Sequence, residues 1–428
     1  MSARKRQVAG RAVWGVADQA LSSLTNFAVG VFVARELGPA DFGAFSLAFA
    51  TYLVALNASR GLATDPLVVR FSDASSASWR LAASAAAATS LLVGAAVSIA
   101  CVLAAVVLEG AAETAFLGLA VVSPGLMLQD SWRFVFFAAG RARDAFVNDL
   151  AWAVLIVPFI AAVVTLTRPQ VQWFIIAWGG AAALAGLVGI AQARVRPRMS
   201  LVRRWFSDHR DLGIRYLGEN TSFSAAGQLR LYGLGAVAGL TAVGALRGAE
   251  LLLGPVNLII MGVGSLMAVP EASRLVRRDV RRFKQFIIAL GLLLTGASVL
   301  WGLAIGLLLP ASVGVWLLGA TWDPAAALLL PITLMVALLG VWSSAWTGLR
   351  AMGAAQRSLR AQMVGASAFL FGALLGAIVN GAEGAAWGSA MGNLVASCFW
   401  WQQLHRALRE LQAGRAVAPS VPAHAHGS

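Results

Sequence analysis

Residues 12–64 read AVWGVADQALSSLTNFAVGVFVARELGPADFGAFSLAFATYLVALNASRGLAT, two long apolar stretches joined by a short turn. A transmembrane helix needs about 20 largely apolar residues, and residues 12–34 and 42–64 each reach that length. The first stretch is too long for the apolar core of a cleavable signal peptide, although basic residues precede it. These residues therefore predict two transmembrane helices at the start of the chain.

The whole chain has the composition of a membrane protein. Of its 428 residues, 59% are hydrophobic and only 12% are charged, about half the charged share of a soluble domain. The net charge is +14, but the basic residues fall between apolar runs, where they set membrane topology rather than bind nucleic acid. The two cysteines lie inside apolar runs without metal-ligand spacing, so we expect no disulfide framework and no metal site.

Breaks at charged residues, Pro and Gly clusters divide the chain into twelve candidate spans. They are residues 12–34, 42–64, 81–108, 115–139, 147–167, 171–192, 216–240, 246–269, 285–309, 325–348, 358–379 and 382–404. This pattern predicts an all-α polytopic membrane protein with two six-helix bundles, at residues 1–192 and 216–405. A cytoplasmic or interfacial linker at 193–215 joins them, and residues 406–428 are expected to form a disordered cytoplasmic tail.

The basic residues support this topology. Of the 33 Lys and Arg, 27 fall in segments that twelve spans place on one side of the membrane, or within three residues of them. The six others are Arg35, Arg168 and Arg247 in outer segments and Arg60, Arg133 and Arg230 within spans. Lys and Arg accumulate on the cytoplasmic side, so we expect both termini in the cytoplasm. The large excess of Arg over Lys and the Ala/Gly-rich composition suggest a bacterial genome rich in G and C, so we expect the chain in a bacterial plasma membrane.

A weak internal repeat relates the two halves. A shift of 201 residues pairs Asp18 with Glu219, Gly38 with Gly239, and Gly43 with Gly244. Repeats are common in transporters, where the substrate site lies at the repeat interface. The sequence therefore predicts a 6+6 pseudo-repeat.

Polar residues follow one face of the first span and of the seventh. The first face comprises Asp18, Ser22, Thr25 and Asn26; the seventh span has Glu219, Ser222 and Arg230, with Asn220 and Gln228 beside them. Polar groups are costly in lipid and usually face protein or a hydrated cavity. Both helices are expected to line one substrate cavity. The alternative is that these groups only join helices through hydrogen bonds.

Charged residues inside spans are the other candidates. Arg230 lies near mid-span, too deep to reach water, and is the strongest candidate for binding an anion. Arg60 lies one turn from the inner end, where it either snorkels to the surface or stands at the mouth of a cavity. Asp130 and Arg133 have the spacing of an ion pair within one helix. We assign Arg133, Asp130, Arg35 and Arg247 as secondary site candidates.

Enzyme signatures are absent from the sequence. It contains no P-loop, no GxSxG or HExxH motif and no paired catalytic carboxylates. We therefore predict a transporter rather than an enzyme, with no catalytic residues and no cofactor. The intramembrane acids leave coupling to a Na⁺ or H⁺ gradient open.

The turn between the first two spans resembles that of a known family. Residues 34–43 read ARELGPADFG, similar to the AR-x-LGP-x-[DE]-[FY]-G turn of Wzx-type lipid-linked oligosaccharide flippases, of the multidrug/oligosaccharidyl-lipid/polysaccharide exporter (MOP) superfamily. The GRAR loop at residues 140–143 also looks like theirs. The peptidoglycan-precursor flippases of this superfamily have fourteen transmembrane spans. The twelve spans predicted for this chain therefore favour the polysaccharide branch of the superfamily.

The resemblance implies a function by alternating access. It implies a V-shaped pair of six-helix bundles around a cationic cavity, which Arg60 and Arg230 match by position. The substrate would be an undecaprenyl-pyrophosphate-linked oligosaccharide, with membrane lipids and polysaccharide polymerase machinery as further partners.

Other functions remain open at this point. One is a cation-coupled small-molecule (multidrug) exporter of the same superfamily, which acids in the first and seventh helices would suit. A membrane polysaccharide polymerase or ligase would need a sizeable outer loop, which the chain lacks. A major-facilitator carrier would need a different loop at residues 65–80.

Overall fold

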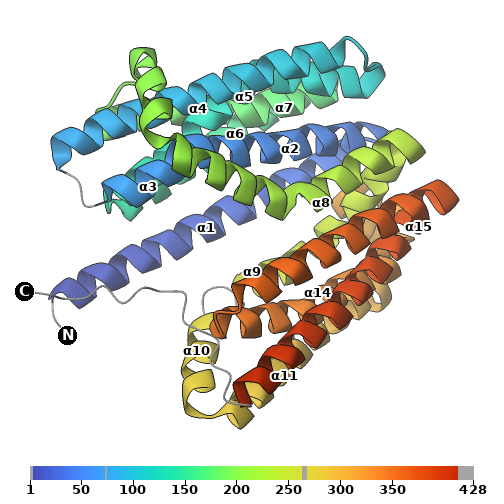
Figure 1. The fold of residues 1–428 in the computed structure, drawn as a ribbon. Coiled ribbons are helices and arrows are strands. Elements are labelled where there is room, and N and C mark those ends of the chain that lie inside the picture. The colour runs from blue at the N-terminus through green and yellow to red at the C-terminus, as the bar shows by residue number, and fades with distance from the viewer. Residues whose placement is uncertain (1–2, 73–74, 263–267, 413–428) are drawn as a thin grey trace, which may run out of the picture. The chain divides into compact units, whose positions relative to one another are not determined.

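The computed structural model describes residues 3–72, 75–262 and 268–412, and none of these residues lies in a strand (Figure 1). This confirms the predicted all-α class. The first half comprises α1 (Ala3–Glu36), α2 (Pro39–Ser59), the π-helical turn η1 (Arg60–Thr64), α3 (Asp65–Phe71), α4 (Ser76–Ala105), α5 (Gly110–Ala138), α6 (Ala142–Leu166), α7 (Val171–Ala193), η2 (Met199–Leu201) and α8 (Val202–Leu252). The second comprises α9 (Gly254–Gly262), α10 (Val269–Arg278), α11 (Val280–Leu303), η4 (Ala304–Leu308), α12 (Ala311–Leu318), η5 (Gly319–Thr321), α13 (Trp322–Ala326), α14 (Leu329–Ala351) and α15 (Ala355–Gln412).

Ten of the described helices are long and apolar enough to span a membrane. One of them, α15, has non-helical backbone at Asn380 and Gly381, which separates the last two predicted spans. The predicted eighth span, 246–269, includes residues 263–267, which lie outside the described residues. The total of twelve spans therefore stays a prediction.

The chain divides into two compact units. The first contains Met1–Tyr232, Gly239–Gly244 and Val315–Thr321, and the second contains the remaining residues. The core of the first unit is built around Trp132 and Phe136 of α5, packed against the alanine-rich face of α4. The core of the second is built around Phe283 of α11 and Trp400 of α15. The helix α15 continues to Gln412, into the segment predicted as a tail, and residues 413–428 lie outside the described residues.

The predicted linker is continuous with the seventh span, because α8 runs through both. Its start docks within the first unit. The Trp205 indole donates to the Leu62 carbonyl oxygen at 3.1 Å, in the π-helical turn that precedes Pro66. Arg70 also binds the Asp211 carboxylate, at 2.9 Å. This part of the linker is therefore held by protein contacts, with Trp205 buried.

Glycines that the 201-residue shift relates pack against each other. A Cβ added at Gly43 would overlap the Leu240 carbonyl oxygen, and a Cβ at Gly244 would overlap the Pro39 carbonyl oxygen. The shift maps Pro39 onto Leu240 and Gly43 onto Gly244, so these two contacts are reciprocal. Reciprocal contacts are expected where two related elements meet across a two-fold axis; the 6+6 repeat of the whole chain stays a prediction.

The close approach at Gly43 gives a stability prediction. The Gly43→Ala protein should be destabilised by about 1–3 kcal/mol, the usual cost of overpacking, because backbone rather than a flexible side chain lies in the way. The control is Gly38→Ala, where an added Cβ meets nothing within 4 Å. Thermal unfolding of both purified variants in detergent measures the difference. Equal melting temperatures would contradict the prediction.

Candidate functional site

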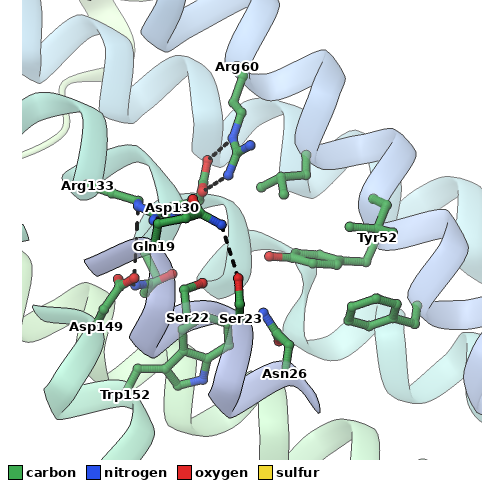
Figure 2. Close-up of a pocket in the computed structure, with 14 residues that line it drawn as sticks. Gln19, Ser22, Ser23, Asn26, Tyr52, Arg60, Asp130, Arg133, Asp149 and Trp152 are labelled. Carbon is green, nitrogen blue, oxygen red and sulfur yellow. Dashed lines mark hydrogen bonds and ion pairs between the residues drawn. The ribbon is translucent and has the colours of Figure 1, made fainter. Parts of the chain in front are cut away.

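A polar pocket of about 170 Å³ lies inside the first unit, between α1, α2, α5 and α6 (Figure 2). Its lining combines two arginines with carboxylates, amides, hydroxyls and aromatic rings. The polar and aromatic lining residues are Gln19, Ser22, Ser23, Asn26, Phe49, Tyr52, Arg60, Gln129, Asp130, Arg133, Asp149 and Trp152. Charged groups on spanning helices are costly unless they pair or face water, so the pairing within this pocket decides what it can bind.

Arg60 reaches the pocket from the junction of α2 and α3. Its Nε and Nη2 donate to the two carboxylate oxygens of Asp130 at 3.0 and 2.7 Å. The guanidinium also lies 4.9 Å from the ring centre of Phe134. The Arg60 side chain keeps 27% of its surface exposed. It is therefore a paired but still accessible cation, and its side chain points to Asp130 in the pocket instead of snorkelling freely to the surface.

The local backbone explains why Arg60 has this position. The five residues Arg60–Thr64 form a π-helical turn, in which the Asp65 N–H bonds back to the Arg60 carbonyl. Single π turns inside helices often occur at functional sites. Gly61 allows the turn to pack directly on the backbone of Leu217 of α8. The wide turn and this contact fix the start of the Arg60 side chain beside α5.

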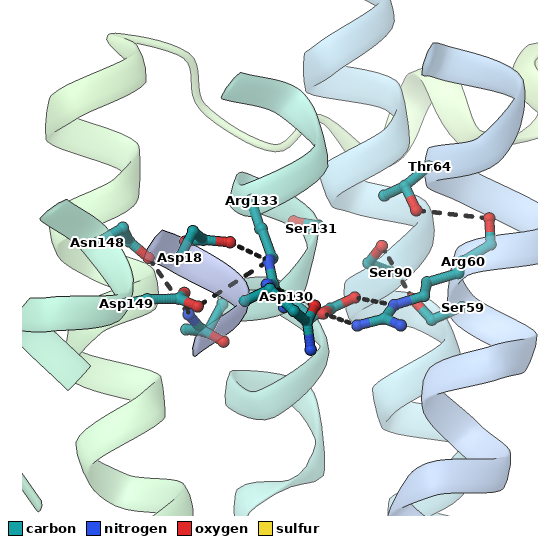
Figure 3. A network of polar contacts seen from close by, with 12 residues as sticks. Asp18, Ser59, Arg60, Thr64, Ser90, Asp130, Ser131, Arg133, Asn148 and Asp149 are labelled. Atoms are coloured by element: carbon teal, nitrogen blue, oxygen red, sulfur yellow. Dashed lines mark hydrogen bonds and ion pairs between the residues drawn. The ribbon is translucent and has the colours of Figure 1, made fainter. Parts of the chain in front are cut away.

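Arg133 is the centre of a second, more buried group of charges (Figure 3). Its Nε donates to Asp18 of α1 at 2.5 Å and lies 4.0 Å from a carboxylate oxygen of Asp149 of α6. Gln129, one turn before Arg133 on α5, donates to the other Asp149 oxygen at 2.8 Å. Arg133 also donates to Gln19 at 3.2 Å. The residues of α5 thus join α1, α2 and α6 through one polar network.

The expected ion pair within α5 is wrong. Asp130 pairs with Arg60 and Arg133 pairs with Asp18, although the i, i+3 spacing allows them to meet. Each has a better-placed partner on a neighbouring helix, because consecutive faces of a buried central helix face different neighbours. The secondary candidates Asp130 and Arg133 are therefore central members of the pocket.

The network carries an excess of acid. Three carboxyl groups (Asp18, Asp130 and Asp149) face two guanidinium groups (Arg60 and Arg133), so full ionisation would leave one uncompensated negative charge. Asp18 is completely buried, and its Oδ1 has no hydrogen-bond partner among the described residues. An isolated buried charge is very costly. The network is therefore suited to hold one further positive charge, such as a proton.

The other residues predicted on the first span divide between two sites. Ser22 and Asn26 line the polar pocket together with Gln19, whereas Thr25 lines an apolar groove on the side of α6. Asp18 lies behind the pocket, facing Arg133. Ser22 and Asn26 thus share one pocket, whereas Thr25 lines the apolar groove.

The candidates of the seventh span do not line the polar pocket. Arg230 is buried, Gln228 is half-buried, and Asn220 donates to Asp65 at 2.8 Å. The side chains of Glu219 and Ser222 lie outside the described part of the structure. A substrate role for these residues remains a prediction.

The two arginines expected near the outer surface have local contacts. Arg35 lies 5.2 Å from the ring centre of Trp316 and 3.8 Å from Glu36. Arg247 binds Glu250 at 2.8 Å. Neither lines the polar pocket.

Sequence reasoning missed several members of the pocket. Asp149 and Gln129 are the most important, because they complete the surroundings of Arg133. Asp149 was detectable as an acid just inside the predicted span 147–167. Tyr52 and Trp152 gave no signal, since aromatic residues at helical spacing are ordinary core residues.

Comparison with known proteins shows the fold. No family model and no curated protein sequence matches the chain. Among solved structures, it is similar to an inward-facing multidrug resistance MATE family transporter of the MOP superfamily, with a TM-score of 0.70 and 14% identity over 93% of this chain and 99% of that one. It is also similar to the lipid II flippase MurJ, with a TM-score of 0.68 and 11% identity over 94% of this chain and 90% of that one.

A third similar structure is a MOP superfamily transporter from Pyrococcus furiosus, with a TM-score of 0.59 and 15% identity over 95% of this chain and 96% of that one. At these identities the similarity concerns the fold: the chain has the fold of MOP superfamily transporters. These structures are transporters or flippases rather than enzymes, and together with the apolar helices they indicate a multi-pass membrane protein.

Proposed function

We propose that the protein is a flippase that moves an undecaprenyl-pyrophosphate-linked oligosaccharide across the bacterial plasma membrane by alternating access. The observation that carries the proposal is the pair of arginines in a pocket of membrane-spanning helices. The planar fork of arginine matches a phosphate group with two parallel hydrogen bonds. The amides and hydroxyls of the same pocket suit the hydroxyl groups of sugars.

Asp130 occupies the place of the substrate while the pocket is empty. It binds the Arg60 fork with two hydrogen bonds, as a phosphate would. Substrate entry then exchanges one anion on Arg60 for another, which avoids leaving a bare cation inside the membrane. The partly exposed Arg60 is the entry point for the diphosphate, and the more buried Arg133 is held by its own acids.

The surroundings of Arg133 favour a proton over Na⁺ as the coupling ion. The guanidinium already lies between Asp18 and Asp149, and a metal ion placed there would be repelled by it. A proton on one of these carboxyl groups neutralises the excess charge without needing several oxygen ligands. Uptake of that proton would loosen the contact between α1, α5 and α6, which couples the gradient to helix movement.

The second candidate function is the small-molecule exporter, which the acid excess of the pocket supports because it would attract an organic cation. Purified protein in proteoliposomes separates the two candidates. We expect it to move a fluorescent undecaprenyl-pyrophosphate-linked sugar, measured by loss of accessibility to an external quencher. Movement of a cationic dye along a proton gradient, without movement of the lipid-linked sugar, would overturn the flippase proposal.

The exchange at Arg60 gives a binding prediction. The Asp130→Asn protein should bind a short-chain prenyl diphosphate sugar about tenfold more tightly, because the substrate no longer competes with a charge-assisted hydrogen bond contributing about 1.5–3 kcal/mol. Calorimetric titration in detergent measures the affinity. The control is Asp144→Asn, which releases Arg141 outside the pocket and should leave affinity unchanged. Weaker binding by Asp130→Asn would mean that Asp130 positions Arg60 and does not compete for it.

A further inference from the structure

An apolar groove of about 610 Å³ runs between α1 and α6 within the first unit. Its walls include Leu24, Ala28 and Phe32 of α1 and Ile156, Val157 and Val164 of α6. The side chains of Leu24 and Val157 are 63% and 67% exposed, so the groove is open along one side. Apart from two threonines, its lining side chains are hydrocarbon.

The groove adjoins the polar pocket on the same two helices and extends beyond it. On α6, Asp149 and Trp152 line the pocket, and the groove starts at the next residue, Ala153. On α1, the groove lining begins at Leu24, between the pocket residues Ser23 and Asn26, and continues beyond them to Phe32. A polar and an apolar site therefore follow each other along a single seam between two helices.

We propose that this groove takes the isoprenoid chain of the lipid-linked substrate while the diphosphate sugar occupies the polar pocket. The inference rests on the proposed function and adds the path of the chain to it. A headgroup bound in the pocket carries a long hydrocarbon chain, which cannot pass among ionised side chains without stripping them of their partners. The groove offers an apolar exit to lipid directly beside the charged residues.

The dimensions of the groove suit one chain. Its α6 wall extends over residues 153–165, which at 1.5 Å per residue is roughly 18 Å, more than half of a hydrocarbon core of about 30 Å. Several isoprene units fit along that length. A bulk phospholipid has two chains and no reason to place its headgroup beside the acid-paired arginines, whereas a single-chain diphosphate lipid meets both sites at once.

The test compares two substrates with the same diphosphate sugar and different tails, undecaprenyl and geranyl, in proteoliposomes. The groove is filled in Ala161→Trp, whose side chain would project from α6 among the lining residues. We expect this variant to move the undecaprenyl substrate about tenfold more slowly, the scale of overpacking an apolar site, and the geranyl substrate at the wild-type rate. The matched control is Val154→Trp, on an exposed residue of α6 outside the groove, which should change neither rate.

A second measurement keeps the inference testable if Ala161→Trp does not fold. A photoreactive undecaprenyl diphosphate sugar should crosslink wild-type protein within residues 24–32 and 153–165, and unlabelled substrate should compete. Labelling of these segments by photoreactive phosphatidylethanolamine, without competition by the lipid-linked sugar, would assign the groove to bulk lipid and overturn the inference. Equal slowing of both substrates by Ala161→Trp would also overturn it. If wild-type protein moves neither substrate, the proposed function itself fails.

Discussion

The Arg60→Ala protein is expected to move the lipid-linked sugar about 30-fold or more slowly than wild type, because removing one partner of a hydrogen-bonded charge pair costs about 2–5 kcal/mol. Arg60 is the partly exposed arginine of the pocket, and its fork already binds a carboxylate in the geometry a phosphate would adopt. Arg60→Lys should retain part of the rate, since lysine keeps the charge but presents a point charge without the planar fork. Quencher accessibility in proteoliposomes gives all three rates.

The matched control for Arg60→Ala is Arg141→Ala. Arg141 also binds an acid, Asp144, and lies 5.2 Å from the ring centre of Phe136, but it is more exposed and outside the pocket. The Arg141→Ala protein should therefore move substrate at the wild-type rate. Since Arg60→Ala leaves Asp130 without its partner, misfolding is tested with Arg60→Ala/Asp130→Ala, which removes both charges. A folded double variant with normal transport would exclude Arg60 from substrate binding.

The membrane fold could be predicted from sequence because hydropathy and charge are local signals. The twelve predicted spans follow the described helices closely up to α7, and the break at Asn380 and Gly381 falls between the last two. The spans at residues 42–64, 216–240 and 246–269 have the least secure predicted boundaries, because they are the most polar, and the helix of the last is interrupted after Leu252. The docking of the linker could not be predicted, since the Trp205 indole donates to a carbonyl that lies 143 residues away in the sequence.

The pocket was only partly predictable because ion pairs between helices depend on packing. Within one sequence, Asp130 and Arg133 have no visible partners except each other. The structure assigns each a partner from a different helix, separated by 70 residues for Arg60 and 115 for Asp18. Identifying charges inside spans was sound, and Arg60, Asp18, Asp130 and Arg133 were all found this way. Matching them to partners required the arrangement of α1, α2, α5 and α6.

The Arg133→Met protein is expected to lose about 3–5 kcal/mol of stability, the cost of breaking a buried charge pair by removing one partner. Methionine fills much of the same volume but leaves Asp18, which is completely buried, without its cation. The loss should appear as a lower melting temperature in detergent and a lower amount of protein in the membrane. Arg141→Met removes an exposed partner instead, and exposed pairs contribute about 0–1 kcal/mol, so this control should remain close to wild type.

Removing the acid as well distinguishes the structural role of Arg133 from its role in transport. In Asp18→Leu/Arg133→Met no unpaired charge remains at Asp18, and Asp149 keeps the hydrogen bond from Gln129. Replacing a buried ion pair by apolar residues is often neutral or stabilising, so most of the lost stability should return. The double variant lacks Asp18 and the guanidinium between the two carboxyl groups, so its transport should respond more weakly to a proton gradient, with Asp149 as the remaining carboxyl group that could exchange the coupling proton. Restored stability together with a wild-type response to the gradient would show that the pair only holds α1 against α5, and the coupling proton would then have to bind at Asp149 or elsewhere.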